Sequence, residues 1–281
     1  DSPAVAARHL LRLTPATFVD EQTRIAASLI IDPAPRERVE RTDFFGAQTI
    51  EAAFDEPHDA IEFTLRARVR RQAGPPGLDL SPPVGVLQRE IQAERSLSPD
   101  APHHFTHASL RAPVLEEVTA FAREAAPAHL TAREAVEAVG RAVHASMTYD
   151  AEATTVETPM DQAFANRHGV CQDLSHVMIA GLRGIGVPAG YVSGYLRTLP
   201  PPGQAKLQGT DAMHAWVRAW CGAETGWVDY DPTNALFVGD DHIVVARGRD
   251  YADVAPVKGV LRTAGEQSSD HAVDVTVVED G

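Results

Sequence analysis

Residues 169–188 read GVCQDLSHVMIAGLRGIGVP, a stretch that predicts a helix with a reactive side chain in its first turn. Its apolar residues recur three and four positions apart: Leu174, Val177, Met178, Leu182 and Ile185. Glycines and a proline end the pattern, so Cys171 lies at the start of a helix of roughly fifteen residues. The first N–H groups of a helix have no partner and favour negative charge. This position therefore stabilises a thiolate, and the same N–H groups can hold an oxyanion.

Residues 214–231, HAWVRAWCGAETGWVDYD, predict a β-hairpin. Its first strand alternates and places four residues on one face: His214, Trp216, Arg218 and Trp220. The return strand places three residues on one face: Trp227, Asp229 and Asp231. If Trp220 pairs with Gly226, His214 falls opposite position 232, and a slip of one residue brings Asp231 across from it. We therefore expect a carboxylate within reach of the imidazole.

Cys171, His214 and Asp231 supply the parts of a nucleophile, a base and a carboxylate that orients the base. Pro232 favours an extended backbone at Asp231, which suits a fixed residue at the end of a strand. Asp229 is a rival for the third role, because it lies two residues away on the same face. The competing interpretation of Cys171 is a buried, inert thiol, a common environment for cysteine.

Composition narrows the class of protein. The 25 basic and 39 acidic residues give a net charge of −14, which argues against nucleic acid and against anionic membranes as partners. The two cysteines, Cys171 and Cys221, make no disulfide framework, so we expect a reduced, cytoplasmic protein. We interpret Cys221 as an incidental exposed thiol in the hairpin loop. No run of about 18 apolar residues predicts a membrane-spanning helix.

The order of the predicted elements indicates the α+β class. Residues 1–104 are predicted to form an N-terminal β-rich domain that ends in an irregular stretch over 74–104. Its strands are expected at 8–13, 23–32, 48–54 and 60–69. Residues 105–281 are predicted to form the core that carries the chemistry, with helices at 113–125 and 131–147 and a strand at 189–196. The second helix opens with a capping-box pattern, Thr131 with Glu134.

Two further groups contain metal-ligand residue types. His103, His104 and His107 are close in sequence, but no acidic or cysteine ligand stands near them in a suitable pattern. We interpret them as solvated histidines of a loop. The second group is Asp240-Asp241-His242. We predict no metal at either group and no cofactor.

Four segments resemble the transglutaminase-like superfamily, whose members are often described as cysteine proteases. They are GVCQDLSH (169–176), GYVSGYL (190–196), HAWVRAW (214–220) and GWVDYDPTN (226–234). The tail DDHIVVARGRDYADVAPVKG (240–259) is similar to the end of the bacterial branch. The openings RHLLRLTP (8–15) and DFFGAQTIEAAFDEPH (43–58) resemble the N-terminal β-region of that branch. The resemblance runs in order over most of residues 8 to 259.

This resemblance implies a papain-like α+β core with Cys171 as nucleophile and His214 as base. In the family the aspartate of the D-x-T motif is the third member, which favours Asp231 over Asp229. Calcium is used by eukaryotic members, but their calcium sites lie outside these motifs. The implied activity is hydrolysis of an amide or peptide bond through a catalytic triad and an acyl-enzyme, with no cofactor.

Several other residues are candidates beside the triad. Gln172 or an upstream residue could be the second oxyanion donor. Asp173 and His176 lie within the first turns of the Cys171 helix, where helix capping and packing are the simpler roles. Trp216 and Trp227 are expected in the core and in the wall of the substrate pocket.

Three alternative functions stay open. An amine could resolve the acyl-enzyme, which would make the protein a transglutaminase acting on protein glutamine. A binding module could have kept the fold without the chemistry, or a metal-dependent hydrolase could use the histidine-rich loop. The substrate is expected to be a peptide, a protein or a small amide, and a homodimer is a common assembly for soluble enzymes.

Overall fold

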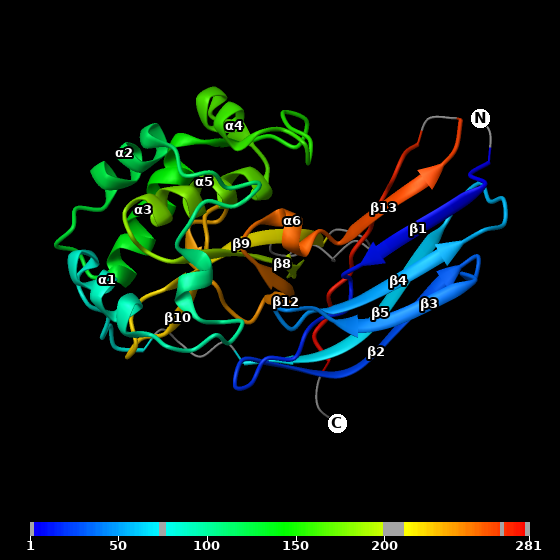
Figure 1. Cartoon of the computed structure of the whole chain (residues 1–281), viewed down its shortest axis with the longest axis horizontal. Coiled ribbons are helices and arrows are strands. Elements are labelled where there is room, and N and C mark those ends of the chain that lie inside the picture. Colours follow the sequence, from blue (N-terminus) through cyan, green and yellow to red (C-terminus); the bar gives the residue numbers. More distant parts are fainter. Residues whose placement is uncertain (1–2, 73–76, 199–210, 265–266, 279–281) are drawn as a thin grey trace, which may run out of the picture.

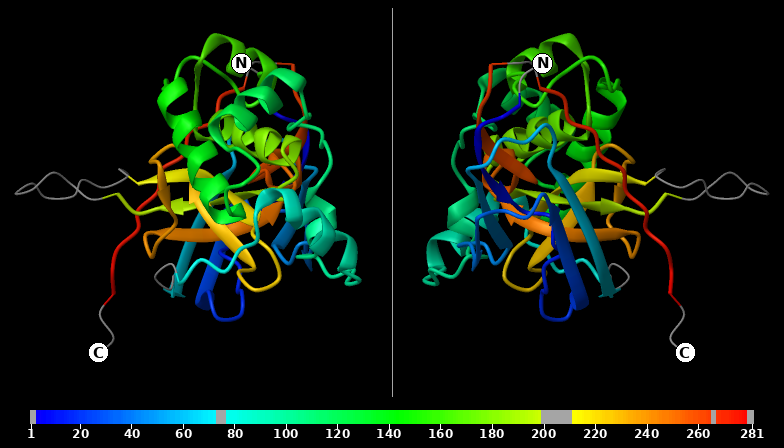
Figure 2. Two further views of the ribbon diagram at one scale, coloured as in Figure 1. Left: turned by 90° about the vertical axis from the view of Figure 1, so that its left-hand side faces the viewer. Right: turned by 90° about the vertical axis from the view of Figure 1, so that its right-hand side faces the viewer.

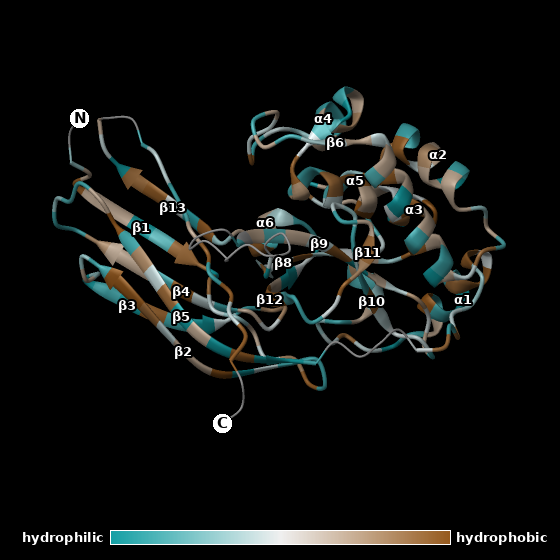
Figure 3. Ribbon diagram, turned by 180° about the vertical axis from the view of Figure 1, so that it is seen from behind, coloured by the Kyte–Doolittle hydropathy of each residue, from teal (hydrophilic) through white to brown (hydrophobic). Residues whose placement is uncertain are grey.

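The structure, a computed structural model, describes residues 3–72, 77–198, 211–264 and 267–278 (Figure 1). Helices and sheets occupy separate parts of it, which confirms the mixed α and β class. A central sheet lies between the helices and the N-terminal strands, which form a separate region at the end remote from α1 and α2 (Figure 3). No helix in these ranges combines the length and the apolar run that crossing a bilayer would need.

The central sheet has five antiparallel strands in the order β11-β10-β9-β8-β12. Their bounds are β8 Ala189–Leu196, β9 Ala212–Trp220, β10 Trp227–Asp231, β11 Leu236–Phe237 and β12 His242–Gly248. The strand predicted over 189–196 and the hairpin predicted over 214–231 are both confirmed. β8 is buried on both faces along its first six residues, as expected for a strand inside a covered sheet.

Helices cover one face of this sheet (Figure 2). The helix α5, Cys171–Gly184, contacts β8 and β9 on one side and three further helices on the others. These are α2 Glu116–Ala125, α3 Ala132–Ser146 and α4 Met160–Asn166. Every residue from Gln172 to Arg183 is buried, because the helix is enclosed all round. The position of Cys171 is therefore set by a helix that neighbouring elements enclose.

The two helices predicted before α5 are confirmed as α2 and α3. The capping box at the start of α3 is also confirmed. The amide of Glu134 donates to the Thr131 hydroxyl at 3.2 Å, and the amide of Thr131 donates to the Glu134 carboxylate at 2.9 Å. The pattern could be read from sequence because both partners lie within one helical turn.

The N-terminal β-region has two layers. One is the antiparallel sheet β13-β1-β4-β3, and the other is the antiparallel ribbon β2-β5. The strands are β1 Ala6–Leu11, β2 Gln22–Asp32, β3 Glu37–Thr42, β4 Gln48–Phe54, β5 Glu62–Arg71 and β13 Val257–Arg262. Apolar residues of both layers pack together, among them Leu11, Leu29 and Phe54. The prediction missed β3, whose sequence ERVERT is exposed throughout and has no apolar alternation.

The prediction of an irregular stretch over 74–104 is wrong. It contains α1, Val84–Ala93, and the start of a 3₁₀ turn at Pro102–Phe105. Leu87 and Ile91 of α1 pack into the core of the helical layer. The breakers that flank this helix, Pro82-Pro83 among them, obscured a short amphipathic pattern. α1 thus packs with the later helices, while β13 from the tail pairs with β1.

Gln22 joins the N-terminal region to the edge of the central sheet. Its buried side chain accepts a hydrogen bond from the Val244 amide at 2.8 Å and donates to the Val244 carbonyl at 2.7 Å. It also donates to the Ala16 carbonyl at 2.7 Å. The side-chain amide of Gln22 thus bonds to the backbone of β12 in the way that the backbone of a neighbouring strand would. Nearby, the Tyr195 hydroxyl donates to the Leu13 carbonyl at 2.8 Å.

We expect Gln22→Ala to lower the free energy of unfolding by about 2 kcal/mol or more, because buried polar groups of Val244 would lose their partners. Denaturant unfolding of the purified variant measures this. Gln92→Ala, at an exposed position of α1, is the matched control and should change stability by less than about 0.5 kcal/mol. Equal stability of the two variants would contradict the expectation.

Candidate active site

Cys171 is the first residue of α5 and is half-buried. The chain reaches it through β7, His168–Gly169, which pairs in parallel with β6, Thr148–Tyr149. The Asp173 carboxylate accepts the Val170 amide at 2.9 Å and the Thr154 hydroxyl at 2.6 Å. Asp173 thus caps the helix. Within the described ranges, the amide of Cys171 itself has no acceptor, so it remains available to a ligand.

His214 on β9 and Asp231 at the end of β10 are in direct contact. His214 Nε2 lies 2.8 Å from Asp231 Oδ2, and both side chains are buried. An ionised carboxylate can only accept hydrogen bonds, so Nε2 carries the hydrogen. Nδ1 is then the ring atom left to exchange a proton with Cys171, whose sulfur acts on the pKa of His214.

The register that produces this contact differs from the predicted one. Trp220 pairs with Trp227, one residue beyond the expected Gly226. Continued along the hairpin, this register places Trp216 opposite Asp231, so the predicted direction of the slip is wrong. His214 reaches Asp231 as a diagonal neighbour on the same face, a separation that a long side chain can span.

Asp231 is fully buried and accepts five hydrogen bonds. Its Oδ2 atom receives His214, His242 at 3.1 Å and the Asn234 side-chain amide at 2.7 Å. Its Oδ1 atom receives the amides of Thr233 at 2.8 Å and Asn234 at 3.2 Å. Burial alone would raise the pKa of Asp231, but the bonds from His214 and His242 hold that pKa well below its ordinary value. The carboxylate is therefore ionised at neutral pH.

His214 is held in its protonated form by its surroundings. Burial lowers the pKa of His214, but hydrogen bonds to Asp231 and Cys171, and the negative charge of both groups, raise it to about 10. The site therefore favours an imidazolium between a carboxylate and a sulfur atom. This is the charge arrangement that a thiolate nucleophile needs.

Asp229, the rival for the third position, is engaged elsewhere. Its carboxylate accepts the Trp216 indole N–H at 3.0 Å. On each strand this pair lies two residues closer to the hairpin loop than the pair of Asp231 with His214. Trp216 is fully buried, with its ring against His242 at 5.2 Å between centroids. A Cβ atom at Gly194 would come within 2.4 Å of this ring, so glycine is needed there. Trp216 therefore presents no face to solvent in this structure.

The other candidate residues lie outside the contact between His214 and Asp231. Gln172 is buried, with its side-chain amide 3.4 Å from the Val156 carbonyl. His176 accepts the Tyr251 amide at 3.2 Å, from α6, Tyr251–Val254, and burial lowers its pKa to about 4. His176 is therefore neutral and links α5 to the tail. Trp227 lies at the far end of the hairpin, where its indole donates to the Asp100 carbonyl at 2.9 Å.

Cys221 is not the exposed thiol that the sequence suggested. It is fully buried, its sulfur lies 3.8 Å from the Ala219 carbonyl, and burial raises the pKa of its thiol. The loop position misled the prediction because the polar loop begins one residue later and Cys221 still packs into the core. The two cysteines therefore differ sharply in accessibility.

One group in the described part of the chain could bring metal-ligand atoms together: His214, Asp231 and His242, whose atoms lie within 4.8 Å of one another. These atoms are already hydrogen-bonded to each other, so the donor set is satisfied without an ion. The residues His103, His104 and His107 form no such group in the described ranges. Asp241 pairs with Arg197, with its Oδ1 atom 2.6 Å from Nε. We assign no metal to the site.

Sequence reasoning missed the contacts that His242 and Asn234 make with Asp231. Asn234 follows Asp231 by three residues, so a turn that returns its amide to the carboxylate could have been considered. His242 comes from another strand, and the sequence had singled it out only as part of the Asp240-Asp241-His242 group of metal-ligand residue types.

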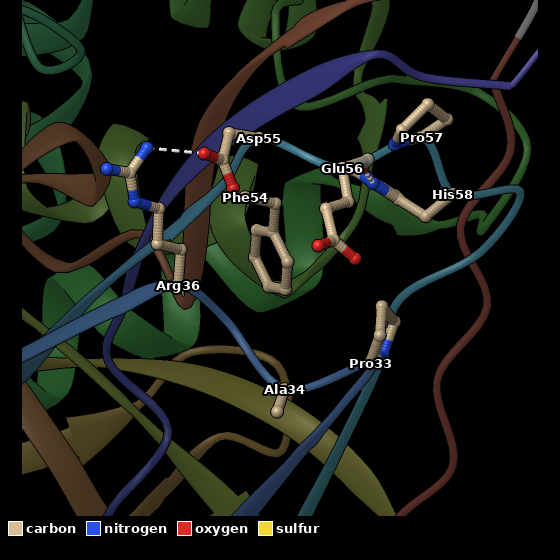
Figure 4. A pocket seen from close by; sticks show the side chains of 8 residues that line it. All are labelled: Pro33, Ala34, Arg36, Phe54, Asp55, Glu56, Pro57 and His58. Atoms are coloured by element: carbon tan, nitrogen blue, oxygen red, sulfur yellow. Dashed lines mark hydrogen bonds and ion pairs between the residues drawn. The ribbon is translucent and has the colours of Figure 1, made fainter.

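One pocket of the N-terminal region lies away from this site. It has a volume of about 420 Å³ and is lined by Pro33, Phe54 and His58 among others (Figure 4). Arg36 and Asp55, which also line it, form an ion pair with each other. None of its lining residues belongs to the candidate active site.

Known proteins match this chain over most of its length. The transglutaminase-like superfamily matches residues 119–232, and the bacterial transglutaminase-like N-terminal region matches residues 1–70. An uncharacterised protein of Mycobacterium tuberculosis is 38% identical over 275 residues, covering 95% of this chain and 86% of that protein. An uncharacterised protein of Mycobacterium leprae is 33% identical, covering 98% of this chain and 94% of that protein.

A solved structure shares the fold. It is described as a "putative cysteine protease" from Cytophaga hutchinsonii, with a TM-score of 0.70 over 92% of this chain and 82% of that chain. The two sequences are 20% identical, so the match speaks for the fold alone. It supports the expected transglutaminase-like architecture of the core.

We expect the His214 imidazole to titrate with a pKa of about 10 and Asp231→Asn to lower that pKa, because the variant removes the negative charge beside the ring. Side-chain nitrogen NMR measures both values. The pKa of His214 in the folded state exceeds the ordinary value of about 6.5. Protonation of His214 therefore stabilises the fold fully below about pH 6.5. This contribution is lost as the pH rises toward 10. A wild-type His214 that titrates near its ordinary value would contradict this account.

Proposed function

Because this chain belongs to the transglutaminase-like superfamily, we propose that it is a thiol-dependent hydrolase of amide or peptide bonds. One observation carries the proposal: Cys171 begins a buried helix and interacts with His214, which is hydrogen-bonded to the buried carboxylate of Asp231. The substrate class is a peptide, a protein or a small amide. No cofactor enters the reaction.

In the first half of the reaction, the Cys171 thiolate attacks the carbonyl carbon of the amide. The Cys171 amide, at the first turn of α5, and one further donor stabilise the oxyanion. His214 gives its Nδ1 proton to the leaving amine, and the C–N bond breaks. The products of this half are a free amine and a thioester between the acyl group and Cys171.

In the second half, water resolves the thioester. Neutral His214 takes a proton from the water at Nδ1 while the oxygen attacks the acyl carbon. The C–S bond breaks, the carboxylic acid leaves, and the thiolate–imidazolium pair is restored. Asp231 orients the ring in both halves and stabilises the imidazolium each time it forms.

Two alternatives differ from this proposal at defined points. An amine that replaces water in the second half would give acyl transfer in place of hydrolysis, with the same acyl-enzyme. A binding module would have no chemical use for Cys171, His214 and Asp231 together. Product analysis with and without an added amine separates the first alternative, and the reactivity of Cys171 separates the second.

We expect brief, substoichiometric iodoacetamide at pH 6 to modify Cys171 selectively over Cys221, and His214→Ala to slow that reaction. The reason is that the imidazolium stabilises the Cys171 thiolate, whereas burial protects Cys221. Mass spectrometry of intact protein and of tryptic peptides measures both rates. A Cys171 rate no faster than that of a free thiol would favour the binding module.

We expect Cys171→Ala to abolish turnover of any amide that the wild type cleaves, with a loss on the order of 10⁴-fold or more. Cys221→Ala is the matched control, because it removes a thiol that lies outside the site and should leave most of the activity. Rates on a panel of peptide and small amide substrates provide the measurement. Full activity of Cys171→Ala would exclude a thiol mechanism.

A further inference from the structure

His242 is a second imidazole on the carboxylate of Asp231. It is the first residue of β12, the edge strand of the central sheet, and its side chain is buried. Its Nε2 atom lies 3.1 Å from Asp231 Oδ2, the same oxygen atom that His214 contacts at 2.8 Å. The proposed reaction gives His242 no step.

The hydrogen on His242 can be assigned from its partner. An ionised carboxylate accepts hydrogen bonds and donates none, so His242 Nε2 must be the donor. The other ring nitrogen, Nδ1, is buried and has no hydrogen-bond partner within the described ranges. A single polar contact therefore fixes this side chain, and that contact is made to Asp231.

The groups around the pair come from three elements. His214 faces Asp231 from β9 and His242 faces it from β12, while the uncharged Asn234 approaches from the turn after β10. The ring of His242 packs against Trp216 and lies 6.1 Å from that of His214 between centroids. Asp229, the other carboxylate of this face, bonds to Trp216.

We propose that His242 is a positioning residue, which donates Nε2–H to Asp231 and so fixes the carboxylate oxygen that orients His214. The inference rests on the proposed function, because a positioned carboxylate matters only if His214 takes part in a reaction. His242 contacts neither the sulfur nor a substrate in this account. It acts through Asp231, and β12 thereby becomes part of the active site.

The donor role distinguishes His242 from a residue that only fills space. A donor to a buried carboxylate favours its ionised form, so loss of that donor lets Asp231 take up a proton at a higher pH. As the pH falls, the Asp231 carboxylate would then be protonated earlier than in the wild type, and the His214 imidazolium would lose its counter-charge at that higher pH. Loss of packing alone would lower stability without moving this pH dependence.

Three variants test the donor. His242→Gln places an amide N–H near the position of Nε2, whereas His242→Asn is too short to reach Asp231 and His242→Leu has no donor. The rate of Cys171 alkylation by iodoacetamide is measured from pH 3 to pH 8, in buffer with a metal chelator. Circular dichroism and thermal unfolding establish that each variant is folded.

We expect the Leu and Asn variants to slow alkylation at pH 6 by about tenfold to a hundredfold and to move the acid limb of the rate profile to higher pH. The Gln variant should stay within a few-fold of the wild type. His9→Leu is the matched control, since it removes a buried histidine of β1 that has no hydrogen-bond partner on either ring nitrogen in the described ranges. Its profile should match that of the wild type.

The outcomes separate this inference from the proposed function. If wild-type Cys171 reacts no faster than a free thiol, the proposed function fails. If it reacts fast and folded Asn or Leu variants keep both the rate and the acid limb, only the role of His242 is overturned. A folded Gln variant that is as slow as His214→Ala would also overturn it, because the donor would then not be what matters.

Discussion

The site depends on one buried negative charge. Asp231 is fully buried and would be costly to keep ionised without compensation. Five hydrogen bonds provide that compensation, and they come from β9, from β12 and from the turn after β10. Because His214 and His242 share one oxygen atom of Asp231, the strands β9, β10 and β12 must keep their relative positions for the charge to remain stable.

The nucleophile is placed by a different element. α5 is enclosed by β8 and β9 on one side and by α2, α3 and α4 on the others, so its first turn cannot shift without disturbing the core. Cys171 begins that turn, and Asp173 takes up the Val170 amide, while the Cys171 amide has no acceptor among the residues that the structure describes. The sheet thus supplies the charged pair, and the helix supplies the sulfur together with the first N–H group of its first turn.

The N-terminal β-region bears on the site through β12. Gln22 bonds to both backbone groups of Val244, two residues beyond His242, and so completes the outer edge of that strand. Tyr195 on β8 bonds to Leu13, and β13 returns to pair with β1. A region with no candidate catalytic residue of its own is therefore continuous with the strand that contacts Asp231.

Local patterns were enough to predict α5, the capping box of α3 and the β9–β10 hairpin, because each is encoded within one continuous segment of the sequence. Tertiary structure decided the rest. The hairpin register follows from packing of both faces, the burial of Cys221 from the core beneath it, and the place of α1 from its contact with later helices. His242 meets Asp231 only because β12 crosses to the far side of β8, and no spacing within the chain encodes a contact made between strands that are not neighbours in the sheet.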